Sequence, residues 1–155
     1  MKKLLILVLL FATPALAQAA APTADVQVTN AYIRTMPPGR TTTAGFLTIA
    51  NNSDQSCELT GAMSTLSNRL EFHEHQHTQG MMKMRPVTTV VVPAGETVVF
   101  EPGALHIMLF NIDTELKAGE FTQMQLITDQ CGSISFDAEV RSLLAKPKKM
   151  EGMHH

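Results

Sequence analysis

Apolar and polar residues alternate with a period of two in many short segments after about residue 25. Such alternation is typical of strands that bury one face and expose the other. It predicts strands over residues 26–34, 44–50, 58–62, 70–74, 88–92, 97–101, 105–110, 121–128 and 133–141. Turn-forming residues separate them, as in Pro37-Pro38-Gly39. No segment has the periodicity of a helix of ordinary length, so the pattern predicts an all-β sandwich or barrel.

The two ends of the chain differ in composition from this alternating region. Residues 1–17 combine a basic start, a short apolar run and small residues, which predicts a secretory signal peptide cleaved after Ala17 or Ala19. The apolar run is shorter than the roughly 20 residues of a membrane span. We therefore expect an exported protein with a flexible linker over 18–24, one domain over 25–145 and a mobile tail over 146–155.

Charge and short motifs narrow the classes of function. The net charge is −2, and loss of Lys2 and Lys3 with the signal peptide makes it −4, which argues against a nucleic-acid partner. The sequence contains neither Gly-x-Ser-x-Gly nor His-Glu-x-x-His, and its acidic residues form no recognisable catalytic pair. We therefore expect a protein that binds a ligand and is not an enzyme.

The cysteines, Cys57 and Cys131, would lie in an oxidising compartment after export, where a disulfide is chemically permitted. A structural bridge is favoured over free thiols, and the lack of Cys-x-x-Cys spacing argues against a redox-active pair. A blue-copper centre requires a Cys thiolate with two His, and Cys131 has no nearby downstream His. An electron-transfer copper protein is therefore disfavoured.

Histidine and methionine gather on faces that the alternation turns away from the core. The apolar residues at 105, 107 and 109 share one face of a predicted strand, so the residues between them share the other. By the same reasoning Phe72 is buried, and His73, which follows it, faces outward. In any extended conformation Met82 and Met84 lie on the same side of the chain. The residues selected in this way are His73, Met82, Met84, His106 and Met108.

A mixed set of imidazoles and thioethers is typical of copper rather than zinc. Thioether sulfur is a soft, neutral ligand that selects Cu(I), whereas zinc sites draw on Cys, His and carboxylates. A single Met is more often core filling, and a single outward His is more often a solvated side chain. A His and a Met on the same outward face of one strand favour a metal site. Further candidate ligands, suited to Cu(II) where histidines are close, are His75, His77, Met82, Met150, Met153, His154 and His155.

The spacing of these residues resembles the motif of the periplasmic PCu(A)C copper chaperone family. That motif is a His, ten residues, a Met, twenty-one residues and then His-x-Met, and every interval is matched by His73, Met84, His106 and Met108. The neighbouring sequences Glu-Phe-His-Glu, Met-Lys-Met-Arg-Pro-Val and Pro-Gly-Ala-Leu-His-Ile-Met-Leu are also similar to the family. The resemblance covers about residues 26–140, and the two cysteines are not part of the motif.

The resemblance implies a cupredoxin-like Greek-key β-sandwich that holds one Cu(I) through those four side chains at an exposed edge. It further implies a periplasmic chaperone that transfers copper during assembly of respiratory haem-copper oxidases, to a partner such as an oxidase subunit or a thioredoxin-fold copper chaperone. In some relatives the tail resembles an extra copper-binding arm. The alternative is an exported sandwich-type binding domain, or a copper buffer without a dedicated oxidase target.

Overall fold

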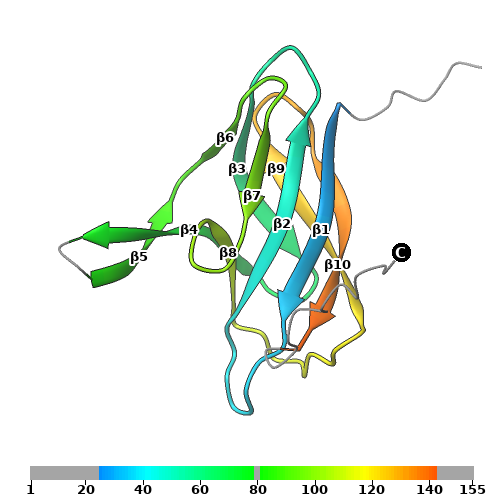
Figure 1. Ribbon diagram of the computed structural model, residues 1–155. Helices are drawn as coiled ribbons and strands as arrows, with labels where there is room; N and C mark the ends of the chain where they lie inside the picture. The colour runs from blue at the N-terminus through cyan, green and yellow to red at the C-terminus, as the bar shows by residue number, and fades with distance from the viewer. Residues whose placement is uncertain (1–24, 79–80, 143–155) are drawn as a thin grey trace, which may run out of the picture.

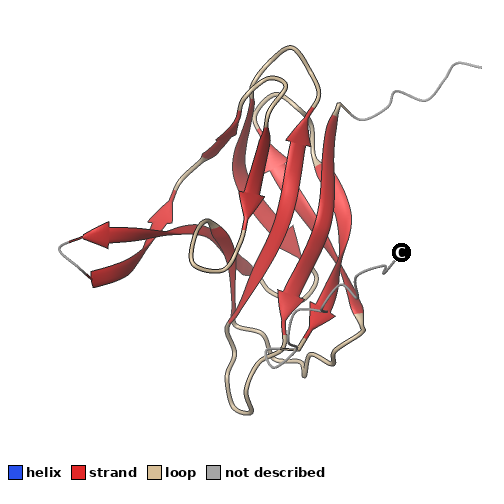
Figure 2. Ribbon diagram, in the orientation of Figure 1, coloured by secondary structure: helices blue, strands red, loops and turns tan. Residues whose placement is uncertain are grey.

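The computed structural model describes residues 25–78 and 81–142 and contains strands, turns and loops (Figure 2). The predicted signal peptide, linker and tail lie outside the described residues, and with them Met150, Met153, His154 and His155. Within the described ranges, no helix has the length and apolar character needed to cross a membrane.

Ten strands form one continuous sheet that curls into a two-layered sandwich (Figure 1). They are β1 (Val26–Arg34), β2 (Thr43–Asn51), β3 (Cys57–Ser64), β4 (Arg69–Thr78), β5 (Met81–Val87), β6 (Val90–Val92), β7 (Thr97–Phe100), β8 (His106–Phe110), β9 (Phe121–Thr128) and β10 (Ile134–Arg141). Their order is β5-β4-β8-β2-β1-β10-β9-β3-β6, and β7 pairs with β2. Within this set, β1 and β10 pair in parallel and the other neighbours are antiparallel.

The core lies between the layers and is built from the inner faces of the strands. Ile107 and Leu109 on β8 are fully buried, as is Ile33 on β1. Phe72 on β4 packs near Phe100 on β7, with ring centroids 5.9 Å apart. Burial of an apolar side chain of this size contributes roughly 1.5–3 kcal/mol. The predicted all-β sandwich is confirmed, and the residues between the buried positions of β8 face away from this core.

The sequence prediction was wrong at the hairpin formed by β4 and β5. The strand expected over 70–74 continues to Thr78, and β5 was not predicted at all. Residues 75–78 are polar without apolar alternation, and Pro86 lacks the N–H of a ladder donor, so the local strand signal is weak. Pairing across the hairpin stabilises both segments, and Pro86 is tolerated because β5 lies at the edge of the sheet. The hairpin projects from the sandwich in Figure 1.

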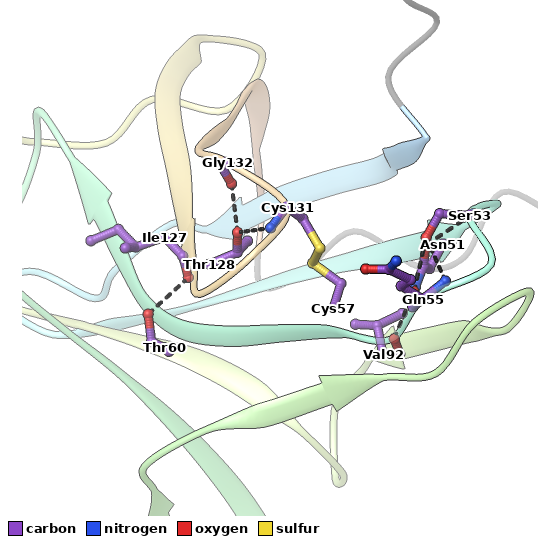
Figure 3. Close-up of a disulfide and its surroundings, with 10 residues drawn as sticks. All are labelled: Asn51, Ser53, Gln55, Cys57, Thr60, Val92, Ile127, Thr128, Cys131 and Gly132. Carbon is purple, nitrogen blue, oxygen red and sulfur yellow. Dashed lines mark hydrogen bonds between the residues drawn. A yellow bond between two sulfur atoms is a disulfide. The ribbon is translucent and has the colours of Figure 1, made fainter.

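Cys57 and Cys131 form a disulfide with their Cα atoms 5.8 Å apart (Figure 3). Cys57 begins β3, and Cys131 lies in the loop between β9 and β10. The Thr128 hydroxyl holds this loop, because it accepts a hydrogen bond from the Cys131 N–H at 3.0 Å and donates to the Gly132 carbonyl at 2.7 Å. The disulfide thus ties β3 to a loop that carries none of the candidate copper ligands.

Candidate metal centre

Strand register brings four candidate ligands to the outer face of β5, β4 and β8. His73 on β4 lies directly opposite His106 on β8. Met108 lies two residues further along β8, and Met84 on β5 lies opposite His75. Opposed residues of antiparallel strands point to the same face, and residues two apart do so as well. Two imidazoles therefore face one another across adjacent strands, with a thioether on each neighbouring row.

His106 is buried although its strand face points away from the core, since only 3% of its surface is exposed. Its ring lies 5.1 Å from the His75 ring, 5.9 Å from the His73 ring and 6.4 Å from the Phe46 ring, measured between centroids. The expectation of an exposed edge is therefore wrong at this residue. Alternation assigns the face of β8, but side chains from β2 and β4 cover that face.

The hydrogen bonds of His106 leave one ring nitrogen for a ligand. Nδ1 lies 2.9 Å from the Ala104 carbonyl oxygen, to which it donates, so Nε2 carries the free lone pair. Burial lowers the pKa of His106, the hydrogen bond to Ala104 opposes this shift, and the charges of His75 and His73 add to the lowering. The neutral form, which a metal requires, is favoured.

His73 presents a buried ring nitrogen without a partner. Its Nε2 donates to the Glu71 carboxylate at 2.9 Å, whereas Nδ1 is buried and has no hydrogen-bond partner within residues 25–78 and 81–142. An unsatisfied buried polar atom costs roughly 1–3 kcal/mol. The Nδ1 lone pair thus fits a metal ligand, and the His73–carboxylate contact is of the kind that fixes the tautomer of metal-binding histidines.

Glu71 and Arg69 form a second layer behind His73, and sequence reasoning missed both. Arg69 Nη2 lies 2.6 Å from Glu71 Oε1. The hydrogen bond from His73 lowers the pKa of Glu71, and the hydrogen bond from Arg69 adds to this. The period-two pattern could have identified Glu71, because it lies two residues before His73 on the same strand face. The Ala104 carbonyl, by contrast, has no side-chain signal in the sequence.

The two candidate thioethers differ in exposure. Met84 is 53% exposed on the edge strand, whereas Met108 is half-buried on β8. A soft donor is therefore available both at the protected centre of the face and at its solvent side. Among the described residues, no group of three or more His, Cys, Asp or Glu side chains is arranged to hold a metal ion. The candidate site instead mixes imidazole nitrogen with thioether sulfur.

The other candidate ligands are placed only in part. The His75 ring lies closest to His106, and its Nδ1 is 3.4 Å from the Ala104 oxygen. For His77 and Met82 the structure describes only their backbone pairing across the β4–β5 hairpin. Of the secondary ligands that the sequence indicated, His75 is therefore the one whose described ring adjoins the site.

Comparison with known proteins identifies the family. A family model described as "LpqE-like: Putative lipoprotein LpqE-like" matches residues 26–140. This chain belongs to the LpqE-like family. One similar protein, described as "Putative lipoprotein Lxx21020", comes from Leifsonia xyli subsp. xyli and is 33% identical over 69% of this chain and 64% of its own length. An uncharacterized protein of Rickettsia prowazekii is 31% identical over 56% of this chain and 48% of its own length. The LpqE-like chain thus spans less than two thirds of these curated relatives.

Solved structures similar to this LpqE-like chain include PCuAC domains. The copper-bound PCuAC domain from PmoF2 is 20% identical with a TM-score of 0.65, covering 76% of this chain and 93% of that domain. The apo form of DR1885 from Deinococcus radiodurans is 26% identical with a TM-score of 0.61, covering 93% and 97%. Its CuI form has a TM-score of 0.59. The resemblance to PCu(A)C-type copper chaperones and the cupredoxin-like sandwich are therefore confirmed.

Proposed function

We propose that this protein is a periplasmic copper chaperone that binds Cu(I) through His73, Met84, His106 and Met108. In this proposal it transfers the ion to a partner during assembly of respiratory haem-copper oxidases. The observation that carries the proposal is the register of β5, β4 and β8, which gathers two available imidazole nitrogens and two thioethers on one face. Copper is the cargo of this protein rather than a resident cofactor, and no catalytic role is assigned.

The donor chemistry supports Cu(I). Thioether sulfur prefers the soft monovalent ion, and the lowered pKa of His106 keeps its imidazole neutral near neutral pH. Four neutral donors leave the single positive charge of Cu(I) uncompensated, so an anionic or sulfur-containing acceptor remains attractive to the ion. The family supports the same ion, because the related DR1885 has been solved in a CuI form.

The arrangement also supports release by ligand exchange. Met84 is exposed on the edge strand, whereas His106 is buried. A ligand from a partner protein would therefore reach the copper ion beside Met84 before the bond between copper and His106 breaks. One new copper–ligand bond would form as one copper–thioether bond breaks, so no free ion is needed and no oxidation state changes. His106 and half-buried Met108 would hold the ion until the last exchange.

A competition titration with a chromophoric Cu(I) chelator tests this ligand set. Met84→Ala, Met108→Ala and His106→Ala should each bind Cu(I) more weakly than the parent protein. Met63→Ala is a matched control for Met84, since Met63 is 55% exposed and lies on β3, outside the proposed site. Parent-like affinity in His106→Ala or Met108→Ala would refute the assignment. X-ray absorption at the copper edge of the reduced, loaded protein should show mixed sulfur and nitrogen ligation.

The second candidate function is a copper buffer, or an exported sandwich-type binding domain, without a dedicated oxidase target. The position of His75 favours this candidate, because it offers a copper ligand beyond the four proposed for Cu(I). Its ring lies 5.1 Å from the His106 ring, which brings a third imidazole to the proposed site. In this version His75, His77 and the tail add Cu(II) capacity. Truncation after Lys149 should then lower Cu(II) uptake and leave Cu(I) binding unchanged, whereas equal Cu(II) uptake by both chains would remove the tail from the proposal.

A further inference from the structure

A row of neighbouring aromatic and arginine side chains extends from His106 over β2, β1 and β10. The Phe46 ring, 6.4 Å from His106, has the Tyr32 ring 5.0 Å away on β1. The guanidinium of Arg34 lies 5.1 Å from the Phe46 centroid, and that of Arg141 lies 4.4 Å from the Tyr32 centroid. Phe46 is buried, with 4% of its surface exposed, and it lies beneath this face. We call Tyr32, Arg34 and Arg141 the arginine surface.

This surface carries two arginines, Arg34 and Arg141, in a protein whose net charge is −2. Arg34 and Arg141 are register partners on β1 and β10, so two like charges are placed side by side, an arrangement that destabilises a sheet. Glu139 offsets one of them through a contact of 2.7 Å with Arg141. The ion pairs found among the described residues do not include Arg34. Its guanidinium is therefore available to an external carboxylate.

The residue types are those of a protein–protein contact. Arginine and tyrosine are enriched at the centres of interfaces, and stacking on an aromatic ring reduces the freedom that a guanidinium loses on binding. The planar guanidinium also matches a carboxylate in a two-point contact. Glu71 and Glu139 lie on the same outer face, so the face alternates in sign. Such a face suits discrete carboxylates on a folded partner better than the continuous phosphates of a nucleic acid or an anionic membrane, which require clustered cations.

We propose that the arginine surface docks an acidic patch of the copper-accepting protein beside the Cu(I) site. This inference rests on the proposed chaperone function. Complementary charges raise the rate of encounter more than the final affinity, and salt screens them. The arginine surface would therefore set the rate of copper transfer, while the His and Met ligands set how tightly the ion is held.

The test uses two synthetic acceptor peptides with the same Met-rich Cu(I)-binding motif, one extended by glutamates and the other by glutamines. Stopped-flow mixing with the full chain loaded with Cu(I) gives the second-order transfer rate at low and high salt. Arg34→Gln should slow transfer to the acidic peptide by about three- to tenfold at low salt, with no effect at high salt or on the glutamine peptide. Arg34→Lys, which keeps the charge, should restore most of the rate.

Arg85→Gln is the matched control, because Arg85 is exposed on β5 and lies on the strand face opposite Met84. An equal rate in Arg34→Gln and the parent would overturn the proposal, as would an equal slowing by Arg85→Gln, which would indicate overall charge alone. Loss of binding to vesicles of phosphatidylglycerol in Arg34→Gln, with unchanged peptide transfer, would assign the surface to membranes instead.

Failure of the docking inference is separable from failure of the proposed function. Chelator competition reports Cu(I) binding by each variant without any acceptor. If the parent protein binds no Cu(I), the chaperone proposal fails. The docking inference can still be tested, because binding of the copper-free acidic peptide can be measured at low and high salt for the parent and for Arg34→Gln. If that binding is the same for the parent and Arg34→Gln, the docking inference fails as well.

Discussion

Replacement of Glu71 by glutamine tests how the proposed Cu(I) site is positioned. Glu71 accepts a hydrogen bond from His73 Nε2 at 2.9 Å and pairs with Arg69 at 2.6 Å. Both contacts lower the pKa of Glu71, so the carboxylate is anionic at neutral pH. Glutamine keeps the size and one oxygen acceptor but removes the charge. The hydrogen bond that places the His73 proton on Nε2, and so frees Nδ1, becomes weaker.

The size of the effect follows from this indirect role. Loss of a hydrogen-bond partner behind a metal ligand typically lowers metal affinity by about 10- to 100-fold. The Glu71 side chain is 30% exposed, so solvent already screens part of its charge. We therefore expect a loss near the lower end, about tenfold in Cu(I) affinity. Direct removal of His73 should cost more, because a ligand is then lost.

The assay is competition for Cu(I) with a chromophoric chelator under anaerobic conditions. Glu139→Gln is the control, since Glu139 also pairs with an arginine, Arg141, at 2.7 Å but lies on β10, away from β4 and β8. It should leave Cu(I) affinity unchanged. Equal affinities for Glu71→Gln and the parent would refute the claim that Glu71 orients His73.

Two further predictions concern stability. Because burial lowers the pKa of His106 below its ordinary value of 6.5, the unfolded chain takes up a proton there before the folded protein does. The free energy of unfolding of the metal-free protein should therefore fall as pH drops through about 6.5, measured by urea unfolding, and His106→Gln should show a shallower fall. An equally steep fall in that variant would contradict the assignment. The Cys57–Cys131 bond closes a 74-residue separation, for which chain entropy predicts about 4 kcal/mol. The Cys57→Ala/Cys131→Ala variant should lose stability of that order in chemical denaturation and retain Cu(I) affinity; a parent-like midpoint would show that the bond contributes little.

The sequence by itself determined the strands with buried faces and the identity of the candidate donors. The strands β1 and β9 have the bounds that alternating apolar residues predicted. Successive side chains of a strand point to opposite faces, so a strand with one buried face can be recognised from its local sequence alone. The same alternation separated His106 and Met108 from Ile107 and Leu109. The family resemblance followed from the spacing of four residues, which needs no knowledge of their positions in space.

Only the tertiary structure decided how the strands that carry those candidate donors lie side by side. The register of β4 with β8 sets His73 opposite His106, and the β4–β5 pairing sets Met84 opposite His75, and neither register is encoded in local alternation. Burial of His106 comes from Phe46 and the rings of β4, which arrive from distant parts of the chain. The residues of β5 carry little strand signal of their own. The strand forms because it pairs with β4 across the hairpin, despite Pro86. Pairing between strands is a long-range interaction, and a period-two pattern specifies a face without specifying its neighbours.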